Sequence, residues 1–250
     1  MKKTRKLLLK MVYTALFISL TFAATYIKIN FSIGGMIHLG NFVAILAALL
    51  FGGLIGGISG SIGMGLYDII NGYPYTTFIR TFIVKFCFCF IVGSLLRVLL
   101  KKEKEYKILP LILSIIFLII GSLSLFLYFT QPELLKEPLL FLLSAILMYV
   151  FSILFLVLLL IGHKIQKLLR LVILSSSIGV MVNVILEFIL RTLFLVLVGE
   201  NFHSAVVASI LKTPSALVNS IITIMMVFIF FMPLYLSTRK INSLNDIEMN

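Results

Sequence analysis

Charged residues are scarce in this chain. Asp, Glu, Lys and Arg make up 12% of its 250 residues, hydrophobic residues make up 61%, and the mean hydropathy is +1.19. An ordinary soluble domain is about 25% charged and about 45–50% apolar. A chain with so little polar surface must be solvated by lipid, so its composition excludes a soluble domain and a soluble enzyme.

The chain also lacks residues for disulfide or metal chemistry. Its two cysteines, Cys87 and Cys89, are two positions apart in an apolar run, so they point to different faces of a helix. The three histidines lie far apart, with no zinc-type cluster. Tryptophan is absent, so Tyr and Phe must anchor the chain at membrane interfaces. We expect no metal and no cofactor.

Acidic residues number nine, and no chain of acids runs through the apolar segments, so a proton relay is poorly supported. No P-loop pattern occurs, and the chain therefore does not hydrolyse ATP by that chemistry. The serines at 175–177 have no histidine at their level, and residues 57–61 form only an imperfect nucleophile-elbow motif. A membrane hydrolase is weakly supported.

The net charge of +12 could indicate nucleic-acid binding, but the basic residues form short clusters between apolar segments. Such clusters are typical of cytoplasmic loops that face anionic headgroups. The clusters are Lys2, Lys3, Arg5, Lys6 and Lys10; Arg97, Lys101, Lys102, Lys104 and Lys107; Lys164, Lys167 and Arg170; Arg239 and Lys240. We therefore expect no nucleic-acid partner.

Eight apolar segments lie between polar breaks. They are 8–26, 39–52, 54–71, 78–98, 108–130, 138–162, 171–198 and 214–236. The first imitates a signal peptide, with small residues at Ala23 and Ala24, but we expect it to be retained as a span. The run 39–71 is too long for one span, because a helix of 33 residues would be about 50 Å long against a hydrocarbon core of about 30 Å.

Dividing that run at Phe51-Gly52-Gly53 also settles the orientation. All basic clusters, with 15 of the 21 Lys and Arg residues, then fall on the side of the N-terminus, which the positive-inside rule makes cytoplasmic. Lys28, Lys136 and Lys212 fall in outer loops. The sequence predicts an all-α, polytopic transmembrane bundle of about eight spans in a single membrane domain, 1–250, with both termini cytoplasmic.

Small residues recur every fourth position in three rows. The rows are Gly52, Gly56 and Gly60; Gly53, Gly57, Ser61 and Gly65; and Ala15, Ser19 and Ala23. Such rows let helix backbones approach closely in lipid. For the row in the first span, internal packing and a docking face for a partner helix are both open.

Ionisable and amide residues inside membrane segments are costly and so predict function. With the assigned orientation, the outer half holds His38, Asn41, Asp68, Arg80, Asn183, Glu187, Arg191 and Asn219, and Lys85 lies deeper. Glu187 can pair with Arg191, one turn further along the same face. We predict one polar pocket open to the outside. The alternatives are charges that only hold helices together, for Glu187 and Arg191, and a solvated interfacial side chain, for His38.

A family resemblance rests on the stretch between residues 34 and 95. Its motifs are Gly35-Met36-Ile37-His38-Leu39-Gly40-Asn41, residues 47–52 (AALLFG), residues 60–70 (GSIGMGLYDII), Tyr73-Pro74 and residues 81–85 (TFIVK). This stretch resembles the substrate-binding S components of energy-coupling-factor (ECF) vitamin transporters, in the subfamily linked to riboflavin, pyridoxine and thiamine-precursor uptake. The last two spans, with Lys212-Thr213-Pro214, are similar more loosely.

The resemblance implies a vitamin pocket that faces outward in a bacterial plasma membrane. It also implies that Ala15, Ser19 and Ala23 dock onto a transmembrane T component driven by two ATPases. Since the family typically has six spans, residues 1–100 and 171–240 correspond to its core, and 108–162 are expected to be an inserted helix pair.

We therefore predict an S component that captures a water-soluble vitamin or vitamin precursor. Asp68 and Glu187 would accept hydrogen bonds, and Arg80, Lys85 or Arg191 would pair with an acidic group. Asn41, Asn183 and Asn219 would supply amide contacts. A stand-alone secondary transporter or channel and an accessory membrane protein are the alternatives. A zwitterionic, weakly acidic or aromatic ligand fits the predicted pocket equally well.

Overall fold

Eight helices make up most of the part of the chain that the structure describes. The computed structural model describes residues 2–30, 35–101, 108–130, 138–161 and 165–240. The elements are α1 (Lys2–Thr25), β1 (Lys28–Asn30), β2 (Met36–His38), α2 (Gly40–Phe51), α3 (Gly53–Ile70), α4 (Tyr75–Lys101), α5 (Ile108–Thr130), α6 (Pro138–Ile161), α7 (Lys167–Leu197) and α8 (Phe202–Lys240). Each predicted span has its own helix, so the predicted all-α bundle is confirmed.

Seven of the eight helices are long and apolar enough to cross a membrane. The exception is α2, whose 12 residues make about 18 Å of helix against a hydrocarbon core of about 30 Å. The prediction of about eight membrane helices is confirmed, with α2 shorter than a full span.

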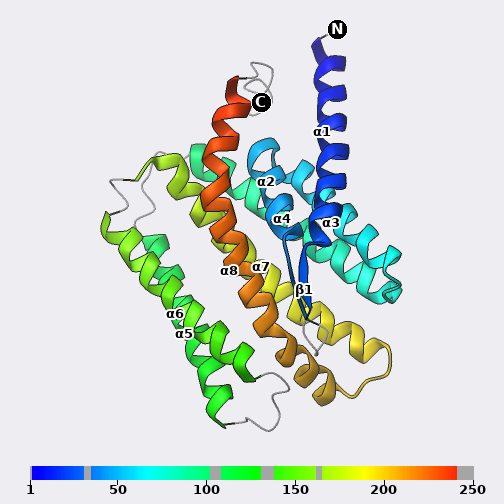
Figure 1. Ribbon diagram of the computed structural model, residues 1–250, viewed down its shortest axis with the longest axis vertical. Helices are drawn as coiled ribbons and strands as arrows, with labels where there is room; N and C mark the ends of the chain where they lie inside the picture. The colour runs from blue at the N-terminus through cyan, green and yellow to red at the C-terminus, as the bar shows by residue number, and fades with distance from the viewer. Residues whose placement is uncertain (1, 31–34, 102–107, 131–137, 162–164, 241–250) are drawn as a thin grey trace.

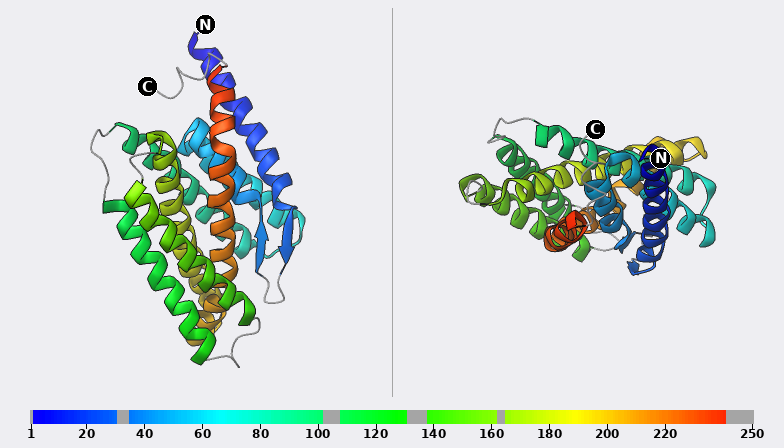
Figure 2. Two further views of the ribbon diagram at one scale, coloured as in Figure 1. Left: turned by 60° about the vertical axis from the view of Figure 1, so that its left-hand side comes forward. Right: turned by 90° about the horizontal axis from the view of Figure 1, so that it is seen from above.

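The start of α1 and the end of α8 lie at the same end of the bundle, because successive helices alternate in direction (Figures 1 and 2). Arg97 and Lys101 close α4 there, and Lys167 opens α7 there. Of the basic residues placed in loops from the sequence, five fall outside the described part of the chain: Lys102, Lys104, Lys107, Lys136 and Lys164. The described basic helix ends thus agree with a common cytoplasmic side for both termini.

The chain reverses direction at Gly52, between α2 and α3. Gly52 has a φ of +101°, which is unfavourable for any residue with a Cβ. Residues that lie equally many positions before and after Gly52 in the sequence are then in contact. A Cβ on Gly56 would lie 2.4 Å from the Ala48 Cα, and one on Gly60 would lie 3.1 Å from the Ala44 Cβ. The predicted division of the run 39–71 is confirmed.

The two glycine rows of α3 face different neighbours. The row with Gly56 and Gly60 faces α2, while a Cβ on Gly53 would lie 2.4 Å from the Phe90 carbonyl oxygen of α4. Gly65, at the far end of this second row, faces the Phe78 ring of α4. The predicted role of these rows in close helix packing is confirmed.

The segment predicted only as an outer loop contains a β-hairpin. Strands β1 and β2 are antiparallel, with Ile29 opposite Ile37. The Lys28 ammonium donates a hydrogen bond to the Tyr67 hydroxyl of α3, and this bond raises the pKa of Lys28. The hairpin is thereby fixed to the end of the bundle opposite the termini (Figure 1).

Helix α8 begins at Phe202, twelve residues before the predicted start at Pro214. The prediction placed this boundary wrongly, because proline usually stops a helix. Here the Thr213 hydroxyl donates to the Ser209 carbonyl at 3.0 Å, and the Ser215 hydroxyl donates to the Lys212 carbonyl at 2.8 Å. Hydroxyl groups beside a proline are one way in which membrane helices tolerate it.

Helices α5 and α6 form a pair at one side of the bundle, far from α1 (Figure 2). The Ser114 hydroxyl donates to the Ser152 carbonyl, and the Ser152 hydroxyl donates to the Ser114 carbonyl, each at 2.9 Å. The rings of Phe117 and Phe155 stack with their centroids 5.4 Å apart. The pair meets the remaining helices mainly where α6 packs on α8.

Candidate functional site

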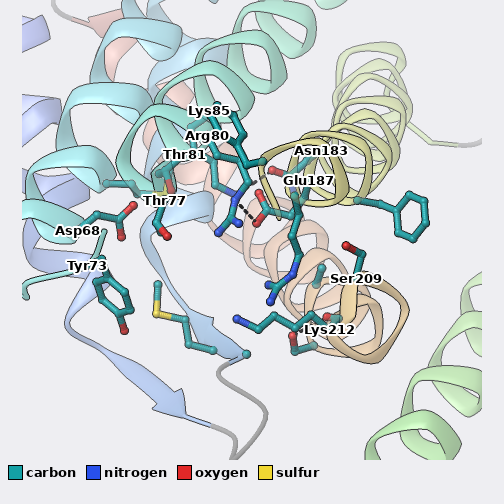
Figure 3. A pocket seen from close by; sticks show the side chains of 18 of the residues that line it. Asp68, Tyr73, Thr77, Arg80, Thr81, Lys85, Asn183, Glu187, Ser209 and Lys212 are labelled. Carbon is teal, nitrogen blue, oxygen red and sulfur yellow. Dashed lines mark hydrogen bonds and ion pairs between the residues drawn. The ribbon is translucent and has the colours of Figure 1, made fainter. Parts of the chain in front are cut away.

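A polar cavity of about 420 Å³ lies among α1, α2, α3, α4, α7, α8 and the hairpin, at the end of the bundle away from the start of α1 (Figure 3). All nine residues predicted to form a pocket line it: His38, Asn41, Asp68, Arg80, Lys85, Asn183, Glu187, Arg191 and Asn219. No described residue of α5 or α6 does. The structure thus brings the nine together, and their role in ligand binding stays a prediction.

The alternation of helix directions explains why such distant residues meet. Asp68 lies near the end of α3, and Arg80 lies near the start of α4. Glu187 lies toward the end of α7, and Asn219 lies in the half of α8 nearer its start. These parts share one end of the bundle, so the polar residues are concentrated there.

Arg80 and Glu187 form an ion pair between α4 and α7. The Arg80 Nε and the Glu187 Oε1 are 3.1 Å apart, and the side chains are 14% and 27% exposed. The predicted pairing of Glu187 with Arg191 is wrong, because the facing helix supplies a closer cation. The pair joins two helices and also forms part of the cavity wall.

Lys85 lies deep in the cavity, with 8% of its surface exposed. Its ammonium donates a hydrogen bond of 2.8 Å to the Asn183 side-chain oxygen (Figure 3) and lies 5.9 Å from the centroid of the Phe88 ring. No carboxylate of the described residues lies within ion-pair distance of Lys85. The Lys85 ammonium is therefore bound by a neutral amide, the Asn183 side chain, and not by a carboxylate.

Besides the Arg80 Nε, which forms the ion pair with Glu187, three polar atoms of the cavity residues are buried without a hydrogen-bond partner among the described residues. They are the Asn41 Oδ1, the Asp68 Oδ2 and the Arg191 Nε. Asn41 is 3% exposed and Asp68 is 4% exposed. Leaving such a group unpaired costs about 1–3 kcal/mol. A ligand group that reaches these side chains would supply the missing partners.

His38 is 6% exposed, so the alternative of a solvated interfacial side chain is wrong. Its ring Nδ1 accepts a hydrogen bond of 3.2 Å from the Gly40 backbone N–H. The His38 backbone N–H donates to the Asn219 side-chain oxygen at 3.3 Å. Burial lowers the pKa of His38 to about 3, with further lowering by Lys85 and Lys28. His38 is therefore neutral, and because its Nδ1 accepts a hydrogen bond, its ring proton lies on Nε2, which is a donor.

We expect the folded chain to lose stability as the pH falls from 6.5 to 5. Between the folded pKa of about 3 and the unfolded value of about 6.5, only the unfolded chain binds a proton at His38. Acidification therefore favours unfolding, by about 1.4 kcal/mol per pH unit.

Thermal unfolding in detergent can be followed with a thiol-reactive dye, since Cys89 is fully buried. His38→Gln should flatten the pH profile, and the control His203→Gln, at an exposed histidine, should keep it. The same slope in all three chains would contradict the assignment to His38.

Sequence reasoning missed nine polar residues of the wall: Thr25, Tyr73, Thr76, Thr77, Thr81, Ser209, Lys212, Thr213 and Ser215. A signal was present for two of them, because Thr77, Thr81 and Lys85 are four residues apart and share one face of α4. Lys212 was assigned to an outer loop because Pro214 was read as the start of the helix. With α8 extended to Phe202, Lys212 enters the cavity (Figure 3).

The small residues of α1 face outward. Ala15, Ser19 and Ala23 are all exposed, whereas Thr21 and Ala24, on the other side of α1, are buried. Internal packing of this row, one of the two alternatives, is therefore wrong. The row is available to another helix.

The helices and the cavity define a multi-pass membrane protein with one polar site at the end opposite its termini. Residues 7–159 match the family model described as ECF-type riboflavin transporter, S component. This match covers more than half of the chain, and the chain belongs to this family of transport components, which is not an enzyme class. No curated protein and no solved structure matches the chain. The predicted resemblance is confirmed. The match ends within α6, so α7 and α8, which carry Glu187 and Arg191 among other wall residues, lie beyond it.

Proposed function

We propose that the chain is the substrate-binding subunit of an ECF-type importer in a bacterial plasma membrane. It would capture a water-soluble vitamin or vitamin precursor from outside the cell. The observation that carries the proposal is the gathering of nine polar residues from six elements around one cavity. A cavity of about 420 Å³ has the size of known small-molecule sites, which range over about 300–1,000 Å³.

The position of the cavity supports capture from outside. It lies at the end away from the basic helix ends, and basic residues near helix ends favour the cytoplasmic side. Within the cavity, Asp68 and Asn41 would accept hydrogen bonds from the ligand, and Asn183 and Asn219 would contribute amide contacts. Glu187 would also accept a hydrogen bond from the ligand, but only in addition to its ion pair with Arg80.

Transport would require partners, because the chain has no P-loop for ATP hydrolysis. We propose a transmembrane T component and two ATPase subunits. The exposed row of Ala15, Ser19 and Ala23 would allow close approach of a helix of the T component.

We further propose that residues 1–100 and 171–240 form the core of the subunit, and that 108–162 are an added helix pair. Support comes from the packing of α5 and α6 mainly on each other and from their absence among the wall residues. An added pair of helices keeps the orientation of everything after it, because the number of crossings stays even.

Mass spectrometry of the small molecule that copurifies with the chain in mild detergent tests the proposal. We expect a vitamin-like compound in the parent and its loss in an Asp68→Asn, Glu187→Gln double variant. Glu200→Gln, at an exposed position in the turn before α8, is the matched control and should keep the compound. An empty parent that also shows no thermal shift with any vitamin of a panel would refute the proposal.

A further inference from the structure

The charges on the cavity wall do not balance. Arg80, Lys85, Arg191 and Lys212 line it together with only two carboxylates, Asp68 and Glu187. With both carboxylates ionised the wall carries a formal net charge of +2, because His38 is neutral. In a site surrounded by lipid, such an excess is costly unless an anion compensates it.

The excess can be assigned to particular residues. Arg80 is neutralised by Glu187, and Lys85 is held by the neutral Asn183. Arg191 and Lys212 have no carboxylate of the described residues within ion-pair distance, and the Arg191 Nε is buried without a hydrogen-bond partner. These two side chains are the cations of the wall that are best placed for an added negative charge.

A hydrogen bond between helices sets these two residues at one level. The Thr192 hydroxyl of α7 donates to the Ser209 hydroxyl of α8 at 2.9 Å. Arg191 directly precedes Thr192, and Lys212 follows Ser209 by three residues, so both lie beside this link. Lys212 is close enough to Arg191 to be repelled by it electrostatically, and its ammonium extends into the cavity (Figure 3).

The part of the wall opposite Arg191 and Lys212 presents hydrogen-bond acceptors. Asp68 lies across the cavity from Lys212, with Thr77 and Tyr73 near it (Figure 3). The Asp68 Oδ2 and the Asn41 Oδ1 are acceptors without a donor among the described residues. This part favours N–H or O–H groups, while the part with Arg191 and Lys212 favours an anion.

We propose that the ligand is a small organic acid whose carboxylate or phosphate binds between Arg191 and Lys212, with its hydrogen-bond donors directed to Asp68 and Asn41. The proposal rests on the function proposed above and narrows its substrate class. A guanidinium can hold a carboxylate or phosphate through two parallel hydrogen bonds, and the lysine adds a point charge.

Titration calorimetry on the purified chain with matched pairs of probes tests this proposal. The pairs are riboflavin and riboflavin 5′-phosphate, nicotinamide and nicotinate, and panthenol and pantothenate. For the scaffold that binds, we expect the acidic member to bind about tenfold more tightly or better, as charge-assisted hydrogen bonds require. Lys212→Gln and Arg191→Gln should each reduce this preference to within about threefold, because one of the two cations is lost.

Two further variants distinguish charge from folding. Lys212→Arg keeps the charge and should keep the preference. Lys167→Gln removes an exposed lysine at the other end of α7 and should behave as the parent. Equal or tighter binding of the neutral member, or a copurified compound without an acidic group, would overturn the acidic-ligand proposal and leave the proposed capture function intact. An empty parent that binds none of the probes would overturn both.

Discussion

Vitamin uptake by cells is expected to be abolished when Ala15 and Ser19 are both replaced by leucine, while ligand binding by the purified chain stays unchanged. Both residues are exposed on α1 and do not contact the cavity. Two leucine side chains would hold a partner helix away from the α1 backbone, where small residues allow close packing. Uptake of labelled vitamin, copurification of the T component and titration calorimetry give the three readouts.

Ser237→Leu is the matched control for this experiment. Ser237 is also an exposed serine of a membrane helix, and its hydroxyl donates to the Pro233 carbonyl within α8, as the Ser19 hydroxyl donates to the Ala15 carbonyl. This variant should keep uptake. Normal uptake with the α1 double variant would remove the docking face from the proposed function, and loss of ligand binding would show a folding defect.

The second large effect is expected at Gly93, where a single methyl group should strongly destabilise the fold. A Cβ on Gly93 of α4 would lie 2.3 Å from the Gly53 backbone nitrogen and 2.6 Å from the Ala48 carbonyl oxygen. Three helices meet at this point through backbone atoms, which cannot rotate away as side chains do. We expect Gly93→Ala to cost about 3 kcal/mol or more, the upper end of the usual range for overpacking.

Gly60→Ala provides the comparison in the same helix cluster. Its added Cβ would lie 3.1 Å from the Ala44 Cβ and 3.1 Å from the Cys89 Sγ, both side-chain atoms. A small shift relieves these contacts, so the cost should be much lower. Apparent unfolding temperature and size-exclusion profile in detergent measure both variants. Similar losses in the two would contradict the argument that the backbone contact at Gly93 is critical.

Much of the fold could be predicted from the sequence, because lipid imposes simple rules. The limit on helix length required a break in the run 39–71, and the basic clusters required that the break reverse the chain. Gly52 supplies the conformation for that reversal. The start of α8 was missed because a local rule about proline was applied without its neighbours, and Thr213 and Ser215 are the residues that offset it.

The hairpin was missed for another reason. Strands of three residues carry no clear alternation of polar and apolar side chains, and a pair this short is unstable alone. Its position depends on distant contacts, such as the bond from Lys28 to Tyr67 and the bond from the His38 N–H to Asn219. Contacts of this kind appear only once the helices are assembled.

For the cavity, the sequence predicted which residues gather but not how they pair. Because a charge in lipid has a high free-energy cost, Arg80, Glu187 and Arg191 were each predicted to be functional residues. Their pairing depends on which helix faces which, and α4 packs against α7. The packing of α8 against α7 places Lys212 beside Arg191, which no spacing along the chain could reveal.

The reciprocal serine bonds between α5 and α6 have an evolutionary consequence. Two helices that satisfy each other's polar groups, and of which no described residue lines the cavity, are free of the constraints that the proposed ligand binding would place on the other six. Among descendants of this chain, substitutions should therefore accumulate faster on the lipid-facing side of α5 and α6 than in the helices around the cavity, and selection for a new nutrient should leave the pair unchanged.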